Sequence, residues 1–434
     1  MVTTAVRPLV TCASMGDLQP WGVRRFAVLG AGFAGVSVAW HLLQHTTSSA
    51  PVCVELFDEL GVGGGASGAS GGLLHPYNPK GKLLWKGAEG WNAALRLLSV
   101  AETAYSDASA ADQFGPATVP LAWRRGILRL AKEQKHAIDF QKNVNIAASD
   151  ESRIACLGGP AARELVPGLE IPAGGLALHI PQAINVHPQR YLKALWLACE
   201  LFSRNASNSD CPGTQAVLRN HRVDSLRELK GNYEAVIVCL GAQAMLLPEL
   251  LDKLPLTSCR GVVAQLQAPQ GSRNVFCSKA PNLLFGTWLA VQGERDLLLG
   301  ATKDWGSMNA SPHVDNREAS SALEKLIRES APFYPSIKEW EVKGWQAGLR
   351  AIPPRSALGS LPLVGCIDEL VRRSHSEVYS GQTSNIKQTT STKWWLFGGL
   401  GSRGLIHHGW LGDLVAKAVV YRDESLLPQT LKQW

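Results

Sequence analysis

Residues 26–43 read FAVLGAGFAGVSVAWHLL. The apolar run 26–29 predicts a buried strand, the three glycines predict a tight turn, and the run 36–43 predicts a buried helix. Strand, GxGxxG turn and helix in this order are typical of a Rossmann-like α/β unit that holds a phosphate at the helix N-terminus. The stretch therefore predicts a dinucleotide-binding domain.

Each glycine of this turn has its own expected role. Gly30 permits the turn, Gly32 lets the backbone approach a pyrophosphate, and Gly35 allows the helix to pack closely on the strand. A second apolar strand over 52–57 ends at Asp58, whose carboxylate can hydrogen-bond an adenosine ribose.

A second glycine cluster, GGGASGASGG at 63–72, follows the acid. Its small residues with free N–H groups could enclose a long ligand; the alternative is a flexible linker. Linkers join domains and are not followed at once by apolar and turn residues such as LLHP at 73–76. We therefore expect contact with FAD. An NAD-dependent dehydrogenase is the weaker hypothesis, because it leaves 63–72 and 398–404 without a role.

The composition is that of an ordinary globular chain, and 434 residues suffice for two domains with substantial cores. A formal charge of +7 permits an RNA substrate without requiring one. The nine cysteines are scattered without a CxxC pair, which argues against disulfides and a zinc site, so we expect no metal. The longest apolar stretch, 191–202, is too short for a membrane span, which predicts a soluble protein.

The N-terminal residues 1–23 contain a single acid, Asp17. They fit either a transit peptide for a chloroplast or mitochondrion, or a frayed tail on a cytoplasmic protein.

Later segments return to the first domain. The apolar run 233–240 stops at Gly241, and WWLF at 394–397 stops at the glycine-rich turn GGLGSRG at 398–404, before a helical stretch at 411–420. Strands buried on both faces end in this way at loops that cross a cofactor.

Segments 121–180 and 256–345 have a different residue pattern, which predicts short strands at 261–266 and 297–302 and an amphipathic helix at 317–330. They suit an inserted α+β substrate domain built on an antiparallel sheet. The Ser-, Thr- and Gln-rich residues 371–393 predict an exposed loop. The expected division is a tail at 1–23, an FAD-binding domain at 24–115, 181–255 and 347–434, and a substrate domain at 116–180 and 256–346.

Six motifs, in order, resemble the D-amino-acid oxidase superfamily of FAD enzymes, which includes glycine and sarcosine oxidases. They are Gly30–Gly35, Gly65–Gly68, Val186–Pro188, Cys239–Ala242, Gly348–Arg350 and Pro362–Gly365, and the resemblance runs from about Phe26 to Val420. Within this group the sequence is most similar to the FAD oxidase domain of the bifunctional tRNA methylaminomethyl-thiouridine biosynthesis enzyme, through 65–76, 174–188 and above all 398–405.

The sequence also departs from that pattern. Ala69 stands where an asparagine is usual, and His407-His408-Gly409 stand where small residues and a proline are usual. The methyltransferase half of the bifunctional enzyme has no counterpart here.

The resemblance implies an FAD-dependent oxidoreductase that acts on the CH–NH bond of a carboxymethyl-substituted secondary amine. In the tRNA case, the carboxymethylaminomethyl group of the wobble uridine would lose a hydride to the flavin, and the imine would hydrolyse to glyoxylate and aminomethyl-uridine. Oxygen would then reoxidise the flavin, with release of peroxide. Two alternatives are an oxidase or dehydrogenase of a free small amino acid such as glycine or sarcosine, and a catalytically silent flavoprotein.

A guanidinium holds a carboxylate best, because it grips both oxygens in one plane. The candidates are Arg350, preferred as the clamp, and Arg403, since both lie in motifs that the family brings to the flavin.

His75 would border the flavin or the substrate, or would only precede the turn at Pro76. A helix starting at Gly404 would direct its positive dipole at the reduced flavin. Because Gly348–Arg350 contains no cysteine, we expect dissociable FAD. The expected cofactor-binding residues are Gly30, Gly32, Phe33, Ala34, Gly35, Asp58, Gly65, Ala66, Ser67, Gly68, Gly71, Gly72, Gly241, Gly399, Gly401, Ser402, Arg403, Gly404 and Leu405.

Two basic stretches are interpreted as solvated faces rather than RNA-binding surfaces, because acids lie among or beside both. Their members are Arg124, Arg125, Arg129, Lys132 and Lys135, and Arg219, Arg222, Arg227 and Lys230.

Overall fold

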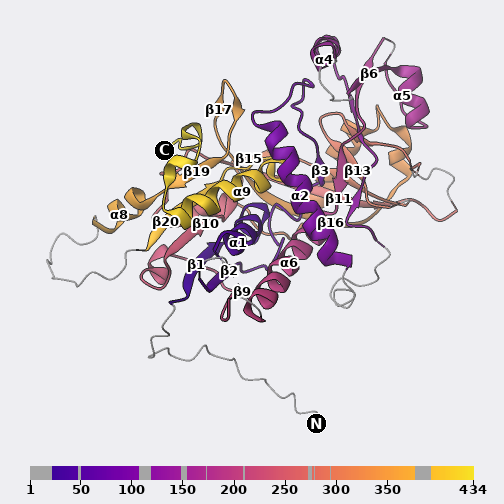
Figure 1. Ribbon diagram of the computed structural model, residues 1–434. Helices are drawn as coiled ribbons and strands as arrows, with labels where there is room; N and C mark the ends of the chain where they lie inside the picture. The colour runs from indigo at the N-terminus through magenta and orange to yellow at the C-terminus, as the bar shows by residue number, and fades with distance from the viewer. Residues whose placement is uncertain are drawn as a thin grey trace.

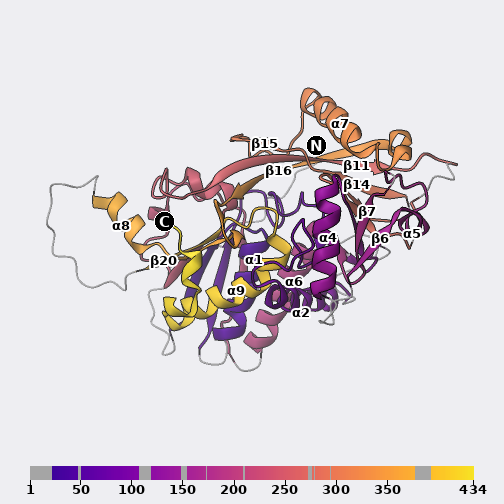
Figure 2. The ribbon, with the colours of Figure 1, turned by 90° about the horizontal axis from the view of Figure 1, so that it is seen from above.

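The computed structural model describes residues 22–46, 50–106, 119–147, 154–172, 174–208, 211–271, 276–277, 279–293, 295–376 and 392–434. Two large sheets organise the chain. In Figure 2 the long strands β11 and β16 and helix α7 lie on one side of the molecule, and helices α1, α6 and α9 lie on the other.

The first sheet has six strands and carries the predicted Rossmann-like unit. Its order is β19 (Leu363–Cys366), β20 (Lys393–Gly398), β10 (Ala235–Val238), β1 (Arg24–Leu29), β2 (Val52–Phe57) and β9 (Gln215–Arg219). All ladders are parallel except that between β19 and β20. The strands expected at 26–29, 52–57, 233–240 and 394–397 are therefore neighbours, although the first and last are more than 360 residues apart.

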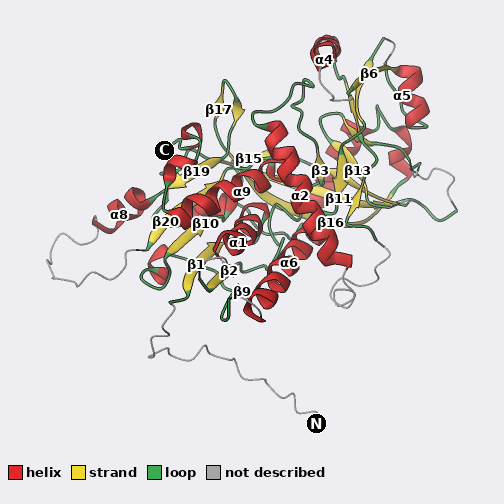
Figure 3. Cartoon of the chain, viewed as in Figure 1, coloured by secondary structure: helices red, strands yellow, loops and turns green. Residues whose placement is uncertain are grey.

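Both faces of this sheet are buried. Phe26 and Val28 of β1 pack with helices on one face, whereas Ala27 and Leu29 face a second apolar cluster on the other. The helices of the first face are α1 (Phe33–Thr46), α2 (Gly87–Ser106), α6 (Pro188–Asn208) and α9 (Gly404–Tyr421), and they lie together in Figures 1 and 3. Burial on both faces explains why the parallel strands read as unbroken apolar runs.

The second sheet has nine described strands. Eight of them follow the order β6 (Ala155–Gly158), β7 (Leu176–Ile180), β5 (Ile127–Leu130), β12 (Asn282–Leu284), β13 (Trp288–Val291), β14 (Asp296–Gly300), β11 (Thr257–Gln267) and β16 (Glu341–Ile352). The ninth, β15 (Asp304–Trp305), pairs with β11 beyond the end of β14. The expectation of an antiparallel sheet needs one correction, because β5 and β12 pair in parallel. The amphipathic helix is α7 (Asn316–Ser330), as predicted, and it packs on β11.

The remaining described elements are short. Helices α4 (Gln134–Ala147) and α5 (Gly159–Leu165) accompany the second sheet, a small sheet joins β3 (Leu73–Leu74), β8 (Ile184–Val186) and β4 (Ala122–Trp123), and β17 (Arg355–Ser356) pairs with β18 (Gly359–Ser360).

Three further sequence expectations concern the 371–393 loop, the domain boundaries and the N-terminal tail. The loop expected at 371–393 is wrong at both ends, because α8 (Asp368–Ser376) and β20 include its first and last residues, while 377–391 lie outside the described residues. The expected division at 346/347 falls inside β16, so the domain boundaries stay a prediction. Nearly all of the tail, residues 1–21, lies outside the described residues. None of the described helices has the length and apolar character needed to cross a bilayer.

Candidate active site

The first glycine turn connects β1 to α1 and is closed by backbone contacts. Gly30 has a φ of +97°, and a Cβ there would lie 2.6 Å from the Cys239 carbonyl oxygen at the end of β10. A Cβ at Gly35 would lie 1.8 Å from the Gly30 carbonyl oxygen, so only glycine lets α1 pack this closely. Helix α1 begins at Phe33, whose N–H donates to Ser67 Oγ at 3.1 Å.

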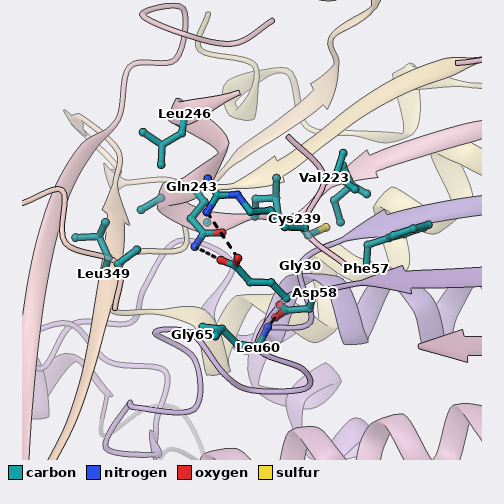
Figure 4. A pocket seen from close by; sticks show the side chains of 18 of the residues that line it. Gly30, Phe57, Asp58, Leu60, Gly65, Val223, Cys239, Gln243, Leu246 and Leu349 are labelled. Atoms are coloured by element: carbon teal, nitrogen blue, oxygen red, sulfur yellow. Dashed lines mark hydrogen bonds and ion pairs between the residues drawn. The ribbon is translucent and has the colours of Figure 1, made fainter. Parts of the chain in front are cut away.

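A cavity opens at the carboxyl ends of β1, β2 and β10 (Figure 4), the edge at which open α/β sheets bind nucleotides. Two acids reach it. Asp58 accepts the N–H groups of Ala31 at 2.8 Å and Leu60 at 2.9 Å, and burial raises its pKa. Glu59 accepts from the Gln243 side-chain amide at 3.3 Å.

Glu59 also pairs with Arg222 at 3.6 Å, and all three of these side chains line the cavity. Because backbone N–H groups already engage Asp58, Glu59 is a second candidate for the ribose hydroxyls. The sequence predicts only the first acid after the strand, Asp58, because a pattern alone cannot separate adjacent acids.

The 63–72 segment is a compact loop. A Cβ at Gly68 would lie 2.0 Å from the Gly63 carbonyl oxygen, and one at Gly72 would lie 1.8 Å from that of Val186. A Cβ at Gly348 of β16 would lie 2.5 Å from Ala66 Cα, so the loop also packs on the second sheet. These backbone contacts are unlike those of a linker.

A larger cavity adjoins the first, and the two share Gly32, Ala66, Ser67, Cys239, Gly241 and Leu349. Its walls come from the loop after Gly65, from the second sheet, and from the 398–404 turn with the start of α9. Gly399 and Gly401 in that turn have positive φ values of +64° and +55°. The first residues of α1 and α9 both line the cavity, so two helix N-termini meet one elongated space.

Most of the expected site residues line one or both cavities, including Arg350, Arg403, His75 and most glycines of the three turns. Gly35 and Gly68 do not, and their close backbone contacts give them a packing role. Residues that line a cavity but were not singled out as site residues include Glu59, Arg129, Trp288 and Lys303.

Four cationic side chains line the larger cavity: Arg129, Lys303, Arg350 and Arg403. No Asp or Glu among the described residues lines it. The Arg350 guanidinium donates from Nη2 to the Thr302 carbonyl at 3.1 Å, and burial lowers the pKa of Arg403. The interpretation of Arg129 as part of a solvated face is wrong, because β5 places it at the cavity. The uncompensated charge favours an anionic ligand.

His75 is held in one neutral form. Its Nδ1 accepts the Tyr77 N–H at 3.2 Å, so Nε2 carries the proton. Burial, with the nearby charges of Arg129 and Arg403, lowers its pKa to about 3. His75 therefore offers the cavity a hydrogen-bond donor and no charge at neutral pH.

The unusual His407-His408-Gly409 run is accommodated behind the cavity. His408 Nδ1 donates to the Leu405 carbonyl at 2.9 Å, and its Nε2 accepts from the Tyr191 hydroxyl at 2.6 Å. Gly409 lets α9 approach α2 closely, since a Cβ there would lie 3.0 Å from the Ala93 backbone. The departure at this point changes packing below the site and leaves the lining residues of the turn in place.

One cluster among the described residues has the composition of a metal site: His41, His45 and Asp413, between α1 and α9. Lys417 Nζ donates to Asp413 Oδ2 at 2.8 Å, and His45 Nε2 lies 2.7 Å from Oδ1. The lysine already supplies positive charge to this carboxylate, which makes the group an ion-pair network between helices. The expectation of no metal stays a prediction.

Buried histidines predict acid-sensitive stability. Burial lowers the pKa values of His187, His407 and His408 to about 4, against about 6.5 in an unfolded chain. Between pH 6.5 and 4 these histidines are protonated in the unfolded state but neutral in the folded state. Their contribution to the free energy of unfolding is therefore fully present above pH 6.5 and is lost as the pH falls towards 4. Each histidine contributes a slope of up to about 1.4 kcal/mol per pH unit.

Thermal unfolding at pH 7.5, 6 and 5 measures this effect. We expect the melting temperature to fall through the series, and His407→Gln to lessen the fall. Equal melting temperatures at pH 7.5 and 5 would contradict the assignment.

Comparisons with known proteins agree with this geometry. The family described as DAO, FAD dependent oxidoreductase, matches residues 25–418. The chain belongs to this family, and its cofactor is FAD. It is 27% identical over 414 residues to the tRNA 5-methylaminomethyl-2-thiouridine biosynthesis bifunctional protein MnmC of Nitrosospira multiformis, covering 90% of this chain and 56% of that protein. The MnmC of an Azoarcus species is 27% identical over 397 residues, with 88% and 55% covered. The chain thus spans about half the length of the curated relatives it matches.

Solved structures share the fold at low identity. Glycine oxidase from Geobacillus kaustophilus has a TM-score of 0.67 at 18% identity, covering 94% of this chain and 98% of its own. Iminodiacetate oxidase from a Chelativorans species has a TM-score of 0.62 at 20% identity, covering 93% and 97%.

The residues present fit FAD. The cofactor needs a long cleft, a place for the pyrophosphate and donors for the reduced ring. The joined cavities, the Gly30–Gly35 turn at the α1 N-terminus, and the α9 N-terminus at Gly404 provide these features in one space. Which of them contact the cofactor remains a prediction.

Proposed function

We propose that the protein oxidises a carboxymethyl-substituted secondary amine, namely the carboxymethylaminomethyl group of a tRNA wobble uridine. The observation that carries this proposal is the similarity, over nine-tenths of the chain, to two proteins named for tRNA 5-methylaminomethyl-2-thiouridine biosynthesis. The cationic lining of the larger cavity, without an acid among the described residues, supports a substrate with a carboxylate.

The residues of the cavity would position the substrate. Arg350 is anchored through Nε and Nη2 to Cys259 and to the Thr302 carbonyl, which leaves the N–H groups of Nη1 for a carboxylate. Arg403 is the second candidate, and His75 can donate to the substrate or to the cofactor. When bound, FAD supplies the hydride acceptor, and oxygen is its expected reoxidant. The substrate loses a hydride from the carbon beside the carboxylate and a proton from nitrogen, and water hydrolyses its imine to glyoxylate and a primary amine.

Mass spectrometry of wobble nucleosides tests the proposal. In cells that lack the protein we expect tRNA to accumulate the carboxymethylaminomethyl nucleoside. Wild-type protein should restore the profile, whereas Arg350→Met should not. An unchanged nucleoside profile in the deletion would reject the tRNA substrate.

Oxidation of a free small amino acid is the second candidate, because a guanidinium at Arg350 suits any amino carboxylate. Peroxide release by the purified protein with glycine or sarcosine, in the absence of tRNA, would favour it.

A further inference from the structure

Arg129 projects from the middle of the second sheet into the larger cavity. In the register of the sheet, Arg129 of β5 lies beside Leu284 of β12, which lies beside Trp288 of β13, which lies beside Gly300 of β14. Arg129, Leu284 and Trp288 all line the cavity. The Trp288 ring covers Gly300, because a Cβ there would lie 2.7 Å from it. This row of the sheet therefore forms one wall, with a guanidinium at its end.

The charge of Arg129 has no partner within the part of the chain that the structure describes. No side chain or carbonyl there hydrogen-bonds or ion-pairs with it, and its Nε is buried without an acceptor. Burial lowers its pKa to about 10, so the group stays protonated at neutral pH. Arg129 as a whole is half-buried, and Nε is its one nitrogen that is fully shielded from solvent. A desolvated cation without an anion is costly for a folded protein, and a ligand anion in the cavity would offset that cost.

Arg129 and Arg350 lie on strands that are far apart in the sheet. Arg350 lies on β16, and β12, β13, β14 and β11 separate that strand from β5. Five strand-to-strand steps of about 4.8 Å place the two backbones roughly 24 Å apart along the sheet. Arg350 is anchored beside Thr302 and Lys303 at the far side, whereas Arg129 lies near His75. The cavity thus has two separate cationic ends.

We propose that Arg129 binds a second oxyanion of the substrate, so that the preferred amine carries two anionic groups, one at each end of the cavity. The inference rests on the proposed function for the first of these groups, the carboxylate at Arg350. The second is the phosphate of a nucleotide or the second carboxylate of a small iminodicarboxylate. Both have the planar or tetrahedral oxygens that a guanidinium binds in pairs.

A binding experiment tests the two-anion site without turnover. The FAD-loaded protein is titrated with dicarboxylates of three to seven carbons and with monocarboxylates of equal carbon number, and binding is followed by the change in flavin absorbance. For the best-fitting chain length we expect the dicarboxylate to bind about 10- to 100-fold more tightly, the range of one charge-assisted pair. Arg129→Met should remove this preference and leave monocarboxylate binding unchanged.

Two variants control for nonspecific effects. Arg124→Met removes an exposed arginine that pairs with Glu102, and it should keep the preference. Arg129→Lys keeps the positive charge but not the paired N–H groups of a guanidinium, and it should keep part of the dicarboxylate preference. Because the wild-type charge is half-buried and has no partner among the described residues, Arg129→Met should melt no earlier than the wild type. Should Arg129→Met fail to fold, Arg129→Gln takes its place, and a full wild-type preference in Arg129→Gln would overturn the proposal.

Turnover then separates the two sources of the second anion. A preference for the carboxymethylaminomethyl-uridine nucleotide over its nucleoside, lost in Arg129→Met, identifies the phosphate. A preference for iminodiacetate over sarcosine, lost in the same variant, identifies a carboxylate.

Other results would overturn the inference. These are equal loss of mono- and dicarboxylate binding in Arg129→Met, absence of any preference in the wild type, or weakened FAD binding in Arg129→Met, which would assign the guanidinium to the cofactor. Failure of the proposed function looks different, because the dicarboxylate preference would persist while no amine is oxidised.

Discussion

Gly68→Ala is expected to yield protein largely free of FAD, with its affinity for the cofactor reduced at least about 100-fold. The added methyl group would lie 2.0 Å from the Gly63 carbonyl oxygen and 3.0 Å from its carbon, both backbone atoms. The loop must therefore open, and it carries Ser67, which accepts the Phe33 N–H, and Ala66, which packs on β16. A strained backbone of this kind costs on the order of 3 kcal/mol.

Gly158→Ala, at the end of β6 and in neither cavity, is the matched control. The nearest protein atom to a Cβ at Gly158 is Pro160 Cδ at 4.0 Å, and its φ of −77° is not in the left-handed region. The FAD-to-protein ratio from absorbance, reconstitution titrations and the unfolding midpoint of the apoprotein measure both variants. We expect the midpoint to fall only for Gly68→Ala. Wild-type affinity and midpoint in Gly68→Ala would show that the loop does not shape the cofactor site.

The sequence was sufficient for the nucleotide-binding half because its signals are local. A buried parallel strand, a glycine turn and a helix start lie within 20 residues at 26–43, and each leaves its own pattern. The same holds for the turn at 398–404, in which Gly399 and Gly401 adopt positive φ values. These patterns predicted the order of elements around both cavities.

Arg129 shows what a local pattern cannot predict. In the sequence it lies among four other cations and near acids, which indicates a solvated face. Its environment comes from β7, about 50 residues away, and from β12, about 155 residues away. Its lack of a partner among the described residues is a property of the assembled sheet, and so is the parallel pairing of β5 with β12. Likewise, only the folded turn shows that Asp58 is engaged by N–H groups while Glu59 extends to Gln243.

Arg350→Met is expected to lower kcat/KM for the carboxymethylamine substrate by about 100- to 1000-fold, or roughly 3–4 kcal/mol. Methionine fills similar space but offers no donor to either carboxylate oxygen. The loss should appear with little change in FAD content, because the described contacts of Arg350 are with Cys259 of β11 and with Thr302, between β14 and β15. Steady-state peroxide release, together with flavin absorbance titrations, provides both measurements.

The pattern across ligands separates a carboxylate clamp from a general effect on the cavity. Arg350→Met should weaken monocarboxylates and dicarboxylates alike, whereas Arg129→Met should weaken only dicarboxylates, since the two guanidinium groups lie at opposite ends. Arg355→Met, at an exposed position in the β17 turn, controls for loss of one positive charge and should behave as wild type. Should Arg350→Met retain wild-type kcat/KM while Arg403→Met loses it, the clamp lies at the start of α9, and the substrate carboxylate points towards that helix instead of β16.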